Sequence, residues 1–188
     1  MKNLIIGTVI AAVVLYLYGF LYWGGAIPYG EHVWKQSSDD SAAGLALVQH
    51  FPDKGTYFVP ASTNAAEARV ALYEQGPVAM VHMLAPQGRP EVDPSIMIQG
   101  FLVNLAFIIA VGLLMKHVVK ALPSFGSRLM MAILAGLACT LLTDIGDIAW
   151  WTIDWQWKVY TGLYHFTAWV IVGAILAAFV RPNEAATA

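Results

Sequence analysis

Four long apolar stretches constrain this chain more than any other feature of its sequence. They cover residues 4–23, about 95–115, about 129–151 and about 159–180. A helix needs about 20 mostly apolar residues to cross a bilayer, and each stretch is that long. Only 12% of the residues are charged, whereas soluble domains average about 25%. We therefore predict a mainly α-helical integral membrane protein whose spans, in residues 1–23 and 95–181, form a four-helix transmembrane bundle.

Basic residues near the span ends predict the orientation of the chain. With the N-terminus inside, five of them fall on the cytoplasmic side: Lys2, Lys116, Lys120, Arg128 and Arg181. The short outer loop before the fourth span then carries only Lys158. We expect a multi-pass inner-membrane protein, N-in and C-in, with residues 24–94 in the periplasm and a cytoplasmic tail at 182–188. A signal peptide is the alternative for residues 1–23, but their apolar run is too long for one.

Residues 24–94 are more polar, and they predict a small extracytoplasmic α/β cap. Helices are expected at 41–50 and 65–75, and strands at 56–60 and 77–84. Ser41, and either Ser62 or Asn64, are the expected helix caps. The order helix, strand, helix, strand favours a right-handed crossover, which is the connection of parallel strands. Because two strands alone are marginal in water, we expect the cap to lean on the bundle, a partner or another copy.

Polar residues inside the spans are the candidates for function, because they are costly in a bilayer. Helical spacing places Asp144 on one stripe with the small residues Ala132 and Gly136, and this stripe matches one that runs from His165 through Trp169 to Gly173. The predicted cluster lies in the outer half of the bundle and consists of Asn104, Asp144, Asp147, His165, Tyr18, Tyr22 and Trp169.

This cluster is compatible with several kinds of chemistry. Asp144, Asp147 and His165 could ligate a divalent metal, with His32, His50 or His82 of the cap as further ligands. The same groups could perform acid–base chemistry on a membrane-soluble substrate, or form a proton or cation path. A buried hydrogen-bonded network that only fixes helix register is the fourth interpretation. Haem is not expected, because the two span-associated histidines, His117 and His165, lie at opposite faces.

No motif in the sequence identifies an activity. The chain lacks the HExxH, GxSxG, P-loop and dinucleotide fingerprints, and a single cysteine excludes a thiolate zinc site. A net charge of -2 gives no basic surface for nucleic acid. The absence of a catalytic motif favours a non-catalytic accessory or interaction subunit. We expect such a subunit to dock a membrane-protein partner or a second copy through its cap and through its aromatic rim, the aromatic residues at the outer ends of its spans. The alternative is a metal- or small-ligand-binding membrane protein, which could be an enzyme and uses the outer cluster.

Overall fold

The computed structural model describes residues 2–24 and 33–182, which form two compact units. The first unit contains the chain up to Lys35 and the chain from Pro94 onward, and the second is Gln36–Asp93. Two sequence predictions fall outside the described residues: His32 as a metal ligand, and the tail 182–188 beyond its first residue.

Four helices of the first unit are long and apolar enough to cross a membrane, which confirms the predicted number of spans. They are α1 (Lys2–Trp23), α5 (Pro94–Val118), a third span over Phe125–Trp150, and α8 (Trp155–Phe179). The third span has three parts, which are α6 (Phe125–Thr140), the π-helix η1 (Leu141–Ile145) and α7 (Gly146–Trp150).

The structure adds two details to the predicted spans. The fourth span begins at Trp155 rather than at about residue 159, because the Asp154 carboxylate caps the backbone N–H groups of Gln156 and Trp157. Lys158 therefore lies on a helix and not in a loop. The third span is not one α-helix, because a π-helical turn interrupts it at 141–145.

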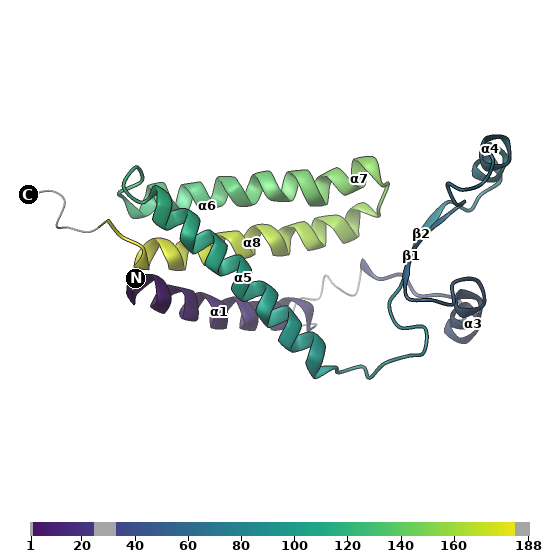
Figure 1. Ribbon diagram of the computed structural model, residues 1–188, viewed down its shortest axis with the longest axis horizontal. Coiled ribbons are helices and arrows are strands. Elements are labelled where there is room, and N and C mark those ends of the chain that lie inside the picture. Colours follow the sequence, from purple (N-terminus) through teal and green to yellow (C-terminus); the bar gives the residue numbers. More distant parts are fainter. Residues whose placement is uncertain (1, 25–32, 183–188) are drawn as a thin grey trace, which may run out of the picture. The chain divides into compact units, whose positions relative to one another are not determined.

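Helix α8 is the centre of the first unit, because α1, α5 and α6 all pack against it. Figure 1 shows α6 and α7 in line beside α8, with α5 crossing the other helices at an angle. Helix α1 also packs against α5. Near the start of α1, a Cβ on Gly7 would lie 2.9 Å from Cβ of Phe179. The two helices are therefore antiparallel, and the start of α1 lies beside the end of α8.

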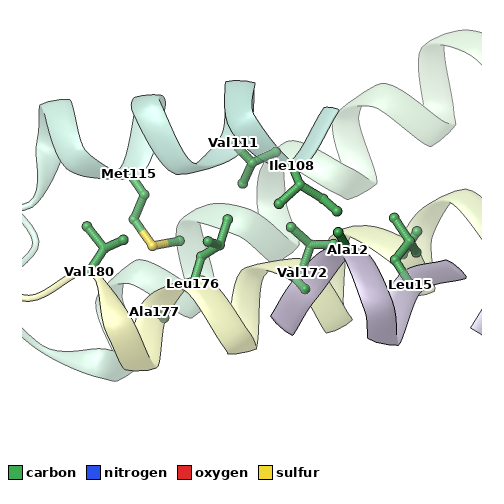
Figure 2. Close-up of a cluster of buried hydrophobic side chains, with 11 residues drawn as sticks. Ala12, Leu15, Ile108, Val111, Met115, Val172, Leu176, Ala177 and Val180 are labelled. Carbon is green, nitrogen blue, oxygen red and sulfur yellow. The ribbon is translucent and has the colours of Figure 1, made fainter. Parts of the chain in front are cut away.

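The apolar core of this unit lies where α1, α5 and α8 meet (Figure 2). Side chains from all three helices are fully buried there, including Leu15, Ile108, Met115, Val172 and Leu176. In a bilayer the lipid tails are as apolar as these side chains, so close packing rather than exclusion of water holds such helices together.

Small residues bring α6 and α8 close together, as their matching stripes predict. A Cβ on Gly173 would lie 2.4 Å from Cβ of Ala132, and one on Gly136 would lie 2.5 Å from Cβ of Trp169. At the end of α8 the buried Arg128 guanidinium donates to the carbonyl of Ala177 at 3.0 and 3.3 Å. This bond satisfies a carbonyl of the last helical turn, which has no partner within the helix.

The second unit contains α3 (Asp40–His50), β1 (Gly55–Val59), α4 (Ala66–Gln75) and β2 (Ala79–Met83). The four elements occur in the predicted order, but the predicted crossover is wrong because β1 and β2 are antiparallel. The helix caps also differ from the prediction. Asp39 caps α3 by accepting the N–H of Ala42, and the capping residue of α4, Ala65, makes no side-chain bond.

The second unit has almost no core of its own. Of residues 36–93, all of which the structure describes, only Pro60 is buried. Neither α3 nor α4 contains a buried residue. Large apolar side chains remain exposed on both helices, such as Leu45 and Val70 at 62% and 56%.

Candidate functional site

The carboxylate of Asp144 is the centre of a charged network between the third span and α8. Its side chain is only 1% exposed. Oδ1 accepts a hydrogen bond from the Thr161 hydroxyl at 2.8 Å and lies 3.0 Å from Nζ of Lys158. Oδ2 lies 2.9 Å from Nδ1 of His165 and accepts from the Thr143 hydroxyl at 3.2 Å. Both oxygens of this buried carboxylate are therefore fully partnered, as a charge in this setting requires.

Local backbone structure explains how Asp144 reaches α8. The residue lies in η1, where the wider turn changes the direction of its side chain relative to an ideal α-helix. Opposite it is Gly162, whose added Cβ would lie 3.2 Å from Cβ of Asp144 and 3.1 Å from Cγ2 of Thr140. Single π-helical turns inside α-helices occur frequently at functional sites.

Lys158 joins the two carboxylates that the sequence identified. Its Nζ lies 3.0 Å from Asp144 Oδ1 and 2.9 Å from Asp147 Oδ2. The ammonium is nearly buried, with 12% of the side chain exposed, whereas the Asp147 side chain is 35% exposed. Sequence reasoning missed this residue because it placed Lys158 in a loop. Its spacing of seven residues from His165, two helical turns, is the signal that could have placed both on one face of α8.

His165 is the most exposed ionisable residue of the network. Nδ1 is held by Asp144, but 52% of the side chain is exposed. One turn further along the same stripe of α8, Trp169 contacts Gly136 of α6 and packs edge-on against Phe107 of α5 at 5.0 Å between ring centroids. Trp169 thus fills the space between α5 and α6, whereas no described residue covers His165 to a comparable extent.

The other predicted site residues belong to a separate aromatic cluster between α1 and α8. Tyr22 donates to the carbonyl of Tyr160 at 2.7 Å, and Tyr160 donates back to the carbonyl of Tyr22 at 2.8 Å. Tyr18 stacks on Tyr164 at 5.5 Å. The side chain of Asn104, from α5, interacts with Tyr164 rather than with Asp144. The structure therefore brings together Asp144, Asp147 and His165, and it places Tyr18, Tyr22 and Asn104 in the neighbouring cluster.

The charged network provides few ligands for a metal ion. Across residues 2–24 and 33–182, no three His, Cys, Asp or Glu side chains are arranged to share a metal. The Lys158 ammonium already bridges the two carboxylates, so a cation belonging to the chain stands where a bound metal ion would bind them. Of the cap histidines proposed as further ligands, His82 instead lies 3.0 Å from the Thr56 hydroxyl through Nδ1.

Asp154 lies just outside the spans and links α8 to the segment that follows α1. Its carboxylate accepts the backbone N–H groups that begin α8 and lies 3.3 Å from Nζ of Lys35. The N–H of Trp157 and the Lys35 ammonium hold the pKa of Asp154 below its ordinary value. Both members of this ion pair are exposed, the lysine side chain by 80%, so screening by water weakens their attraction.

The charged side chains of the described spans form two separate groups, the Asp144 network and the basic residues toward the opposite end. Between the Asp144 network and the basic residues near Lys116, Arg128 and Arg181, these helices contain no Asp, Glu, Lys, Arg or His. Helix segments without these charged side chains therefore separate the Asp144 network from the basic residues. Comparison with protein-family models, curated proteins and solved structures finds no match to this chain.

Proposed function

We propose that this protein binds a small ligand in the membrane, and that the ligand contacts His165. One observation carries the proposal: a polar network inside an apolar bundle ends in a half-exposed imidazole. Ionisable residues inside membrane spans almost always face the bundle interior or a water-filled cavity and pair with one another. Asp144 and Lys158 follow this rule, but the described residues leave 52% of the His165 side chain exposed. Small-molecule binding favours this arrangement, because a few fixed polar groups in an apolar setting orient a ligand.

We further propose an orientation of the chain in the membrane. The basic residues at the end of α5 and the start of α6 favour a cytoplasmic location for that end of the bundle. The network then lies in the outer half of the membrane, and residues 36–93 lie outside the cytoplasm, which is the periplasm if the membrane is a bacterial inner membrane. A ligand dissolved in the outer leaflet would meet His165 without crossing the bundle.

Extraction of small molecules from the purified protein tests this function. The wild type and the variants His165→Ala and Asp144→Asn are purified in parallel, and bound compounds are identified by mass spectrometry. His117→Ala is the matched control, because His117 is an exposed histidine at the end of α5, far from the network along the spans. We expect a compound that the wild type and His117→Ala retain and both network variants lose. The same bound compounds in all four proteins would refute the proposal.

Residues 36–93 support a second function, which is the docking of a protein partner. The observation in its favour is that this unit buries only Pro60 and leaves apolar side chains exposed on α3 and α4. A two-stranded sheet without a core is marginal in water, so a partner chain or a second copy would stabilise it. Light scattering in mild detergent tests this function. A monomer that copurifies with nothing and whose 36–93 amides are protected from hydrogen exchange would contradict it.

A further inference from the structure

The depth of His165 restricts which molecules can reach it. The residue lies ten positions after the start of α8, or about 15 Å along a helix that rises 1.5 Å per residue. The hydrocarbon core is about 30 Å thick, and α8, with 25 residues, is longer than that, so His165 lies inside the core, in the half nearer the start of α8. An exposed imidazole at this level meets lipid tails, which offer no hydrogen bond, and an unpartnered polar group in such a medium is costly. A ligand for His165 must therefore be soluble in the membrane and carry a polar head.

The free ring nitrogen of His165 defines the chemistry of that head. The carboxylate oxygen Oδ2 of Asp144 can only accept a hydrogen bond, so Nδ1 of His165 is the donor and carries the hydrogen. In a neutral ring, Nε2 is then a hydrogen-bond acceptor. A hydroxyl group is the simplest donor to it. The hydrogen bond from Nδ1 to Asp144 fixes this tautomer and the orientation of the ring.

Aromatic rings around His165 favour a flat head. Tyr164 contacts the imidazole edge-on at 5.8 Å between ring centroids. Trp169 lies one turn away on the same stripe of α8, and Phe107 packs against its indole. Aromatic pairs prefer offset-stacked or edge-to-face arrangements and add stabilisation beyond the area they bury. A ligand whose hydroxyl group is on an aromatic ring could therefore pack against aromatic side chains.

We infer that the ligand is a lipophilic molecule with a hydroxylated aromatic head, of the phenol or hydroquinone class, whose hydroxyl group donates a hydrogen bond to Nε2 of His165. This inference rests on the proposed function, which requires only that some small ligand binds at His165.

A defined set of probes tests the ligand class. The protein is placed in nanodiscs of zwitterionic lipid and titrated with decylhydroquinone, with its dimethyl ether, and with decylbenzene. The two controls keep the chain and the ring but cannot donate a hydrogen bond. Binding is followed through the ring nitrogens of ¹⁵N-labelled histidine, with the His165 signals assigned by their loss in His165→Asn. We expect decylhydroquinone to shift these signals and to bind at least tenfold more tightly than either control.

Two variants make the result specific to His165. His165→Asn keeps a side-chain N–H for Asp144 but lacks a basic nitrogen, so it should fold and lose at least tenfold in affinity for decylhydroquinone. His117→Ala should bind within twofold of the wild type. Equal binding of the dimethyl ether, or unchanged binding by His165→Asn, would overturn the inference, as would a dimer whose second copy covers His165. If the extraction experiment finds a compound that depends on His165 but decylhydroquinone does not bind, the ligand class is wrong and the proposed function stands.

Discussion

Replacing Lys158 by Met tests whether the charged network holds the third span against α8. The substitution keeps most of the side-chain volume and removes the ammonium that lies 3.0 Å from Asp144 and 2.9 Å from Asp147. Asp144 is 1% exposed, so its charge would remain buried with only hydrogen bonds to compensate it. Removing one member of a buried ion pair typically costs about 3–5 kcal/mol.

We expect the lower end of that range, because three partners of Asp144 remain after the substitution. Thr143, Thr161 and His165 still hold its two oxygens, and Asp147 can turn toward water from its partly exposed position. The expected loss in the free energy of unfolding is about 3 kcal/mol, which corresponds to about a hundredfold in the unfolding equilibrium constant. In the double variant Lys158→Met/Asp144→Asn, most of this loss should be recovered, because the uncompensated charge is gone.

Titration with sodium dodecyl sulfate in mixed micelles, followed by circular dichroism, measures these changes. Lys35→Met is the matched control, because it removes a lysine from a carboxylate in an exposed pair and should have no measurable effect. A loss of only about 0.6 kcal/mol for Lys158→Met, the average for one interhelical hydrogen bond in a membrane protein, would refute the reasoning. Additive losses in the double variant would refute it as well.

Three further changes test packing, capping and polar burial by thermal melts in detergent. Gly173→Leu should separate α6 from α8 and lower the melting temperature, because a Cβ at this position would lie 2.4 Å from a β-carbon of α6. Gly100→Leu should leave the melting temperature unchanged, because nothing lies within 4 Å of a Cβ there. Asp154→Ala should destabilise α8 at neutral pH. The pKa of the Asp154 carboxyl group is lowered from 3.8, chiefly by the N–H of Trp157. The carboxylate therefore stabilises the folded protein fully above pH 3.8, and this stabilisation disappears as the pH falls through the lowered pKa. Below that pKa the variant and the wild type should be equally stable. Thr140→Val should stabilise the protein by about 1 kcal/mol, because the buried hydroxyl has no hydrogen-bond partner among the described residues.

Helical periodicity was sufficient to predict which faces of the third and fourth spans meet. Ala132 and Gly136 lie on one stripe and Trp169 and Gly173 on another, and the glycines of each stripe lie close to a residue of the other. The same stripes place Asp144 near His165. Lys158 was missed because hydropathy locates the apolar core of a span but not the polar turn before it, where the Asp154 cap extends α8.

The pairing of β1 with β2 could not be predicted from the sequence. A connection of 19 residues that contains one helix can join parallel or antiparallel strands, and alternation of side chains specifies faces but not direction. The sequence also could not predict that Asn104, Tyr18 and Tyr22 lie in the aromatic cluster and not in the charged network. These residues have the right depth for the charged network, but Tyr22 and Tyr160 bond to each other's backbone carbonyls and draw α1 to the other side of α8.

The π-helical turn at Leu141–Ile145 makes the site dependent on the length of the chain as well as on its composition. Such a turn contains one residue more than an α-helical turn. Deleting one residue there would restore a regular helix and rotate everything after it by about 100° relative to α6. Asp147 would then leave Lys158 although no charged residue had been changed. An alignment of this protein with any homologue must therefore match the length of this segment before a shared acidic residue can be taken as a shared site.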